Sequence, residues 1–213
     1  MGCPDPYLTQ DGVLRNLVGA ATRAELAEAE ADLVSARTLT WRGWPTKDAR
    51  LFGTEHLQGL HGHLFGDVYE WAGTFRTTEI SKSGTDFFWP CDTLLTRAKK
   101  VLGALQRGPL LRSGLEQSVY LDALAALYRD VNYLHPFREG NGRTQRLFLS
   151  EVAAYTSRHI DWKAISRLEN DEACATSVTT HSARPLRALL VRAVGCEEER
   201  SQHLDLMASQ LGA

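Results

Sequence analysis

Twelve consecutive residues decide how this chain folds around its chemistry: His135-Pro136-Phe137-Arg138-Glu139-Gly140-Asn141-Gly142-Arg143-Thr144-Gln145-Arg146. Pro136 pushes the residue before it out of the helical region, so a preceding helix ends here and His135 lies at that helix end. Gly140 and Gly142 allow backbone angles closed to other residues and let a ligand approach the main chain. Asn141 is a good cap for a following helix. The stretch therefore predicts a tight loop between two helices.

The side chains of this loop are suited to phosphate chemistry. Unpaired amides at the start of a helix form an anion site, and Arg143 and Arg146, three residues apart, both offer forks of donors to phosphate oxygens. Glu139 adds the carboxylate that Mg²⁺ usually needs beside phosphates, and His135 is the nearby group able to accept a proton. Singly, these residues also fit an inert histidine, a surface ion pair and a plain turn. Together they indicate phosphoryl or nucleotidyl transfer.

Apolar residues at helical spacing dominate the rest of the chain. The pattern predicts six helices, near 22–36, 48–65, 92–106, 115–134, 141–157 and 181–194. In the fourth, Leu121, Leu124, Tyr128, Val131 and Leu134 form one apolar stripe, which predicts a buried helix. Between Trp71 and Pro90, β-branched and aromatic residues around a Ser-Gly turn predict one short β-hairpin.

Composition describes one domain with no specialised partner. The 213 residues carry 24 Lys and Arg against 26 Asp and Glu, so the formal charge of -2 gives no reason to expect direct nucleic-acid binding or attachment to a membrane. The four cysteines are scattered without a C-x-x-C pair, and no apolar run reaches the ~18 residues of a membrane span. We expect free thiols, a cytoplasmic location, and a single domain: an N-terminal arm and helix over 1–45, a helical core with a flap over 46–195, and a C-terminal segment over 196–213.

The twelve-residue stretch resembles the defining motif of the Fic family, H-x-F-x-(D/E)-G-N-G-R-x-x-R, at every specified position. Further stretches resemble bacterial Fic toxins, especially those restrained by a separate small antitoxin; they are Asp5-Pro6-Tyr7-Leu8, Leu14-Arg15-Asn16, Leu64 to Gly73 with Arg76, and His159-Ile160-Asp161-Trp162. The resemblance implies an all-α Fic-fold helical bundle with one short β-hairpin flap.

The resemblance also implies a reaction and a role for each motif residue. His135 would deprotonate a hydroxyl of a target protein, which attacks the α-phosphorus of ATP, so that AMP is transferred and pyrophosphate leaves. Glu139 would hold Mg²⁺. Phe137 would pack the loop rather than take part. The residues implied to bind ATP are Arg138, Gly140, Asn141, Gly142, Arg143 and Arg146.

The hairpin of about Thr77 to Phe88 matches the family's flap, which docks a target segment by strand pairing. Its expected docking residues are Ser83, Gly84, Thr85, Phe87 and Phe88, with either phenylalanine as the clamp. By the same resemblance, the expected targets are type II DNA topoisomerases, namely one subunit of DNA gyrase and one of topoisomerase IV.

Restraint in the family comes from a helix bearing (S/T)-x-x-x-E-(G/N), which this sequence lacks. The nearest approach, Ser166-Arg167-Leu168-Glu169-Asn170, is one residue short, which would rotate its carboxylate by about 100° on a helix. We therefore expect a partner antitoxin to supply the missing glutamate to Arg146.

Other interpretations compete with AMP transfer. A phosphotransferase of the same fold is one alternative, although Gly142 and Arg146 favour AMP; a catalytically idle docking module is another, although it would need neither His135 nor Arg146. His56, His61 and His63 cluster in the sequence, but they are more typical of surface histidines on a helix than of zinc ligands.

Overall fold

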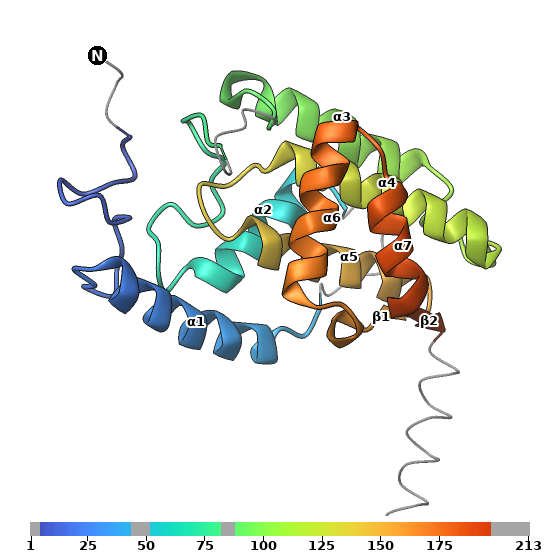
Figure 1. The fold of residues 1–213 in the computed structure, drawn as a ribbon, viewed down its shortest axis with the longest axis horizontal. Coiled ribbons are helices and arrows are strands. Elements are labelled where there is room, and N and C mark those ends of the chain that lie inside the picture. Colours follow the sequence, from blue (N-terminus) through green and yellow to red (C-terminus); the bar gives the residue numbers. More distant parts are fainter. Residues whose placement is uncertain (1–4, 44–51, 82–87, 197–213) are drawn as a thin grey trace, which may run out of the picture. The chain divides into compact units, whose positions relative to one another are not determined.

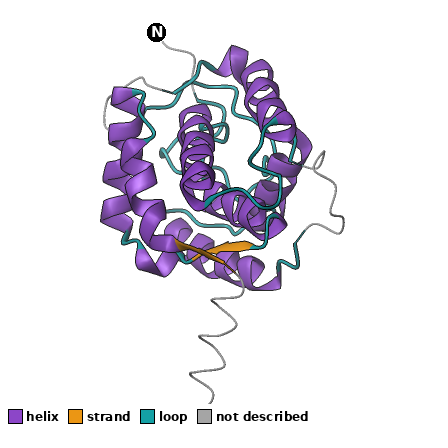
Figure 2. Cartoon of the chain, turned by 90° about the vertical axis from the view of Figure 1, so that its right-hand side faces the viewer, coloured by secondary structure: helices purple, strands orange, loops and turns teal. Residues whose placement is uncertain are grey.

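The computed structural model describes residues 5–43, 52–81 and 88–196, and it divides into two compact units. Unit 1 consists of residues 1–103 and 134–144, and unit 2 of residues 104–133 and 145–213. Helices form almost all of the regular structure, as Figure 2 shows, and the described residues contain one small antiparallel sheet. The all-α fold class is thus confirmed.

Unit 1 contains α1 (Arg23–Thr40), α2 (Thr54–Phe65) and the first part of α3 (Leu94–Arg107), which follows a short 3-10 helix at Cys91–Thr93 (Figure 1). Thr22 and Glu25 form a reciprocal capping box that begins α1. α1 packs on α2, which buries Leu57, Leu60 and Leu64. These helices give unit 1 an apolar core.

Unit 2 contains most of α4 (Gln117–Leu134) and α5 (Asn141–Tyr155), together with α6 (Arg167–Thr180) and α7 (Arg184–Ala193), which pack on each other. A 3-10 helix spans Trp162–Ala164. β1 (Arg158–Ile160) pairs antiparallel with β2 (Val194–Cys196), and Ile160 lies opposite Val194. The apolar stripe predicted for α4 is confirmed, because all five of its residues are buried.

α6 is the helix that the apolar spacing did not reveal. Its sequence is rich in Thr, Ser, Asn and Asp, which are poor helix formers. Ser166 and Glu169 nevertheless form a capping box, and Ala173 and Val178 are buried. The near-miss of the inhibitory motif is therefore the start of a helix.

The predicted flap is described only at its ends. Residues 77–81 and 88–90 form no strand, and Ser83, Gly84, Thr85 and Phe87 lie outside the described residues. The hairpin tip and its docking role stay predictions.

Within the described ranges, none of the helices is both long enough and apolar enough to span a bilayer.

Candidate active site

The motif loop leaves α4 through a left-handed residue. α4 ends at Leu134, and His135 has a φ of 40°, a conformation that costs non-glycine residues energy. The predicted helix end at Pro136 is confirmed. Such a residue persists only where its surroundings hold it in place.

Asn141 closes the loop instead of capping the helix, so its predicted capping role is wrong. It is the first residue of α5, and its side chain accepts a hydrogen bond from the Phe137 amide (2.9 Å) and donates one to the Phe137 carbonyl (2.7 Å). Phe137 itself is fully buried, which confirms its packing role.

His61 supports the loop from α2. Its Nδ1 accepts a hydrogen bond from the Gly73 amide (2.8 Å), so the proton lies on Nε2, which donates to the Glu139 carbonyl (3.0 Å). Its ring stacks on those of Phe137 (3.9 Å between centroids) and Phe65 (4.7 Å). Burial lowers the pKa of His61 to about 4, so the imidazole is neutral near neutral pH. His61 is therefore a buried positioning group, and the surface assignment made from the sequence is wrong for it.

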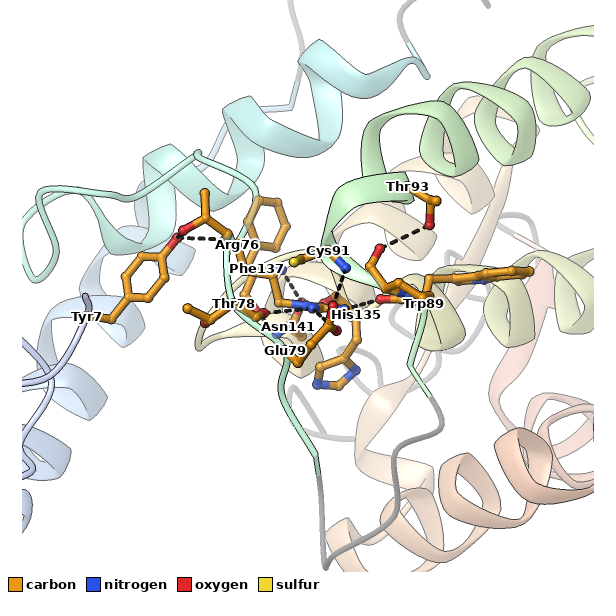
Figure 3. Close-up of polar contacts among 12 residues, drawn as sticks. Tyr7, Arg76, Thr78, Glu79, Trp89, Cys91, Thr93, His135, Phe137 and Asn141 are labelled. Atoms are coloured by element: carbon orange, nitrogen blue, oxygen red, sulfur yellow. Dashed lines mark hydrogen bonds and ion pairs between the residues drawn. The ribbon is translucent and has the colours of Figure 1, made fainter. Parts of the chain in front are cut away.

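His135 presents its imidazole beside Phe88. The two rings stack with centroids 3.9 Å apart and an interplanar angle of 18°. Its backbone carbonyl accepts a hydrogen bond from Arg76 (2.9 Å), and in Figure 3 this network gathers around the backbone of His135 rather than its ring. The predicted base and one predicted flap residue thus lie together.

Arg143 lies between two carboxylates. It forms an ion pair with Glu30 of α1 and lies 3.9 Å from Glu139, and its guanidinium covers the face of Phe65. Glu30 also accepts the hydroxyl of Tyr69, and burial together with that carboxylate raises the pKa of Tyr69. The first motif arginine is thus held by an acid that lies 113 positions away in the sequence.

The remaining predicted ligands have different surroundings. Arg138 forms an ion pair with Asp5 at 2.9 Å. Gly140 has a φ of +77°, and its amide donates to its neighbour Glu139 at 2.8 Å. Gly142 lies in the first turn of α5, and Arg146 lies further along α5, among the residues of unit 2. No carboxylate of the described part of the chain forms an ion pair with Arg146.

A cavity of about 340 Å³ adjoins the loop within unit 1. Apolar residues of the N-terminal arm and α1 line it together with the charged groups of Glu30, Arg138 and Glu139. This cavity gives a charged ligand access to the carboxylate side of the loop.

The donors suit a metal that arrives with its own ligands. The Glu139 side chain is 45% exposed, whereas the described residues contain no cluster of three or more metal-ligating side chains. Mg²⁺ is commonly bound by one or two carboxylates together with phosphate oxygens and water. Glu139 therefore fits a magnesium ion brought by a nucleotide.

Sequence reasoning missed several groups that hold the loop. His61 and Glu30 reach it from distant helices, and Arg76 and Asp5 reach it from loops. Arg76 was part of a family-like stretch but had no role assigned from its chemistry. No local spacing connects any of them to the loop.

Comparison with known proteins places the chain in a family. A profile of the Fic/DOC family matches residues 51–153. The probable protein adenylyltransferase Fic of Escherichia coli K12 is 30% identical over 169 residues, covering 76% of this chain and 79% of that protein. The Salmonella typhimurium counterpart is 30% identical over 196 residues, covering 89% and 92%. The chain belongs to the Fic/DOC family.

Two further matches extend this result. Protein adenylyltransferase VbhT of Bartonella schoenbuchensis is 34% identical over 192 residues, which cover 90% of this chain but only 39% of VbhT. The crystal structure of BepC from Bartonella tribocorum with bound AMPPNP has a TM-score of 0.81 at 22% identity, covering 89% of this chain and 96% of that one. The solved structure shares the fold.

Proposed function

We propose that this chain is a protein adenylyltransferase, a nucleotidyltransferase that moves AMP from ATP to a hydroxyl group of a target protein. The observation that carries the proposal is the complete motif in a braced loop, with the imidazole of His135 at one end and Arg143 and Glu139 at the other. Relatives of similar length are named probable protein adenylyltransferases.

His135 accepts the proton of the attacking hydroxyl. The target oxygen then forms a bond to the α-phosphorus, and the bond from that phosphorus to the bridging oxygen breaks, so that pyrophosphate leaves. A positioned general base contributes roughly 10²–10⁴-fold to such a step. The loop fixes where the imidazole lies, since its backbone is held on both sides of Pro136 by Arg76.

The other motif residues hold the nucleotide. The amides at the start of α5 and the Arg143 guanidinium face the phosphates, Arg146 orients the γ-phosphate, and Arg138 completes the ATP-binding set. Glu139 holds Mg²⁺, which neutralises phosphate charge when bound. Glu30 leaves part of the Arg143 fork available, because the ion pair uses only one of its terminal nitrogens.

The test uses ATP labelled at the α- or γ-phosphorus and a bacterial lysate. We expect α-label on a protein band, lost in His135→Ala and retained in His63→Gln, whose side chain contacts the Arg37 carbonyl of α1. Label from the γ position would indicate a phosphotransferase instead. No transfer by an antitoxin-free preparation would favour an idle docking module.

We further propose that the chain is the cytoplasmic toxin of a pair. A small antitoxin supplies a glutamate to Arg146, and the flap docks a target such as a subunit of DNA gyrase or of topoisomerase IV. Glu169 is unsuited to an internal version of that role, because it caps α6 and forms an ion pair with Arg192 at 2.7 Å. Mass spectrometry of the α-labelled band identifies the target.

A further inference from the structure

One fully buried arginine connects the catalytic loop to both ends of the flap. The guanidinium of Arg76 donates to the carbonyls of His135 (2.9 Å), Thr78 (2.8 Å) and Trp89, and to the carboxylate of Glu79 (3.3 Å), as Figure 3 shows. Its side chain has no exposed surface. Thr78 and Trp89 stand on either side of the residues predicted to form the flap.

The main chain of Arg76 adds a second hold on the catalytic loop. Its amide donates to the Pro136 carbonyl at 2.8 Å, so one residue binds the carbonyls of both His135 and Pro136. His135 has a left-handed φ of 40°, and strain of this kind persists only where the surroundings impose it. Arg76 supplies that restraint.

The same guanidinium controls what packs on the imidazole. Phe88, whose ring stacks on His135, directly precedes Trp89, whose carbonyl Arg76 binds. Trp89 is held from its other side by Arg97, whose guanidinium lies 4.0 Å from the ring centroid. The backbone of His135 and the ring against its imidazole therefore share one anchor.

We propose that Arg76 is a positioning residue for AMP transfer, which sets the placement of the His135 imidazole relative to the flap. The proposal rests on the proposed function. A planar fork can satisfy several carbonyls at fixed angles, whereas a lysine ammonium is a compact charge that cannot reproduce this geometry. Arg76→Lys therefore keeps the charge and removes the alignment.

The experiment separates nucleotide binding from transfer. In Arg76→Lys we expect kcat for α-label transfer to fall about 100-fold, since a misplacement of ~1 Å costs that much. The Kd for ATP, measured by titration calorimetry, stays within about twofold, because the phosphate ligands are other residues. The matched control is Arg158→Lys, which alters a buried arginine that binds the Leu115 carbonyl and covers Tyr120. It should lower stability but leave kcat unchanged.

A spectroscopic signal reports the placement directly. The ring protons of His135 lie against Phe88, so ring current shifts their NMR signal; His135→Asn assigns that signal, and Phe88→Leu gives its position without stacking. We expect Arg76→Lys to move the signal toward the Phe88→Leu position and Arg158→Lys to leave it in place. If wild type transfers no label, the proposed function fails, and this signal alone decides whether Arg76 positions His135.

Three results would overturn the proposal: an unmoved His135 signal in Arg76→Lys, an unchanged kcat in that variant, or a kcat loss matched by equal weakening of ATP binding. If Arg76→Lys does not fold, Glu79→Ala decides. Its side chain is 65% exposed, and its carboxylate joins Arg76 to the Cys91 amide. We expect roughly threefold lower kcat with unchanged ATP affinity, the loss of about one modest hydrogen bond, and an unchanged kcat would count against Arg76.

Discussion

Gly140 is required at its position for two independent reasons. Its φ of +77° disfavours any residue with a Cβ, and a Cβ there would lie 2.3 Å from Cζ of Phe65. Gly114 has the same φ, yet nothing lies within 4 Å of a Cβ at that position. The two glycines thus share backbone strain and differ only in packing.

We predict that Gly114→Ala lowers the free energy of unfolding by about 1–2 kcal/mol, the cost of a left-handed residue. Gly140→Ala should cost about 2 kcal/mol more, because the methyl group overpacks the Phe65 ring. Urea unfolding of both variants measures the difference. Equal losses in the two variants would mean that Phe65 moves aside without cost.

His61 makes stability depend on pH. Its folded pKa of about 4 lies below the ordinary value of 6.5, so the unfolded chain binds more protons between these values. Stability is therefore unaffected above pH 6.5 and falls as pH drops toward 4, by up to about 3 kcal/mol.

We predict that His61→Gln flattens the pH dependence of the unfolding free energy between pH 6.5 and 4.5, while His63→Gln retains it. Denaturant titrations at several pH values provide the measurement. An unaltered slope in His61→Gln would show that other groups dominate acid destabilisation.

At the scale of elements, α6 depends on its first turn. Ser166 and Glu169 satisfy each other's backbone amides, and the Arg192 side chain together with these amides lowers the pKa of Glu169 to about 2. Because this folded pKa is depressed, the cap is fully present above the ordinary value of 4.5 and is lost as pH falls toward 2.

We predict that Ser166→Ala lowers the free energy of unfolding by about 1 kcal/mol, typical of a lost N-cap. Thr179→Ala, an exposed substitution within the same helix, should be nearly neutral. Glu169→Ala should destabilise α6 without changing ATP affinity. Tighter ATP binding in that variant would reveal an inhibitory glutamate after all.

These elements also show which features a sequence can reveal. The end of α4, the glycine turn and the buried stripe of α4 were predictable, since proline, glycine and apolar spacing act on neighbouring residues. α6 was missed because its composition opposes helix formation, although its capping box was a readable signal.

At the scale of the whole molecule, the groups that brace the site come from distant parts of the chain. Glu30 lies 113 positions from Arg143, and His61 lies 78 positions from Glu139. Only folding brings such pairs together, so no spacing in the sequence predicts them. The motif indicated the chemistry, whereas its supports could be found only in the structure.

Restraint of the enzyme is the remaining property of the whole chain. We predict that the isolated chain binds ATP in titration calorimetry, since Arg146 forms no ion pair with a carboxylate of the described residues. Arg146→Ala should weaken ATP binding at least about tenfold and leave ADP binding unchanged, because a charged hydrogen bond to the γ-phosphate contributes ~1.5–3 kcal/mol. Arg167→Ala, whose side chain is 96% exposed, controls for charge and should bind ATP like wild type. If wild type binds ATP only after an internal segment is deleted, the chain restrains itself and needs no antitoxin.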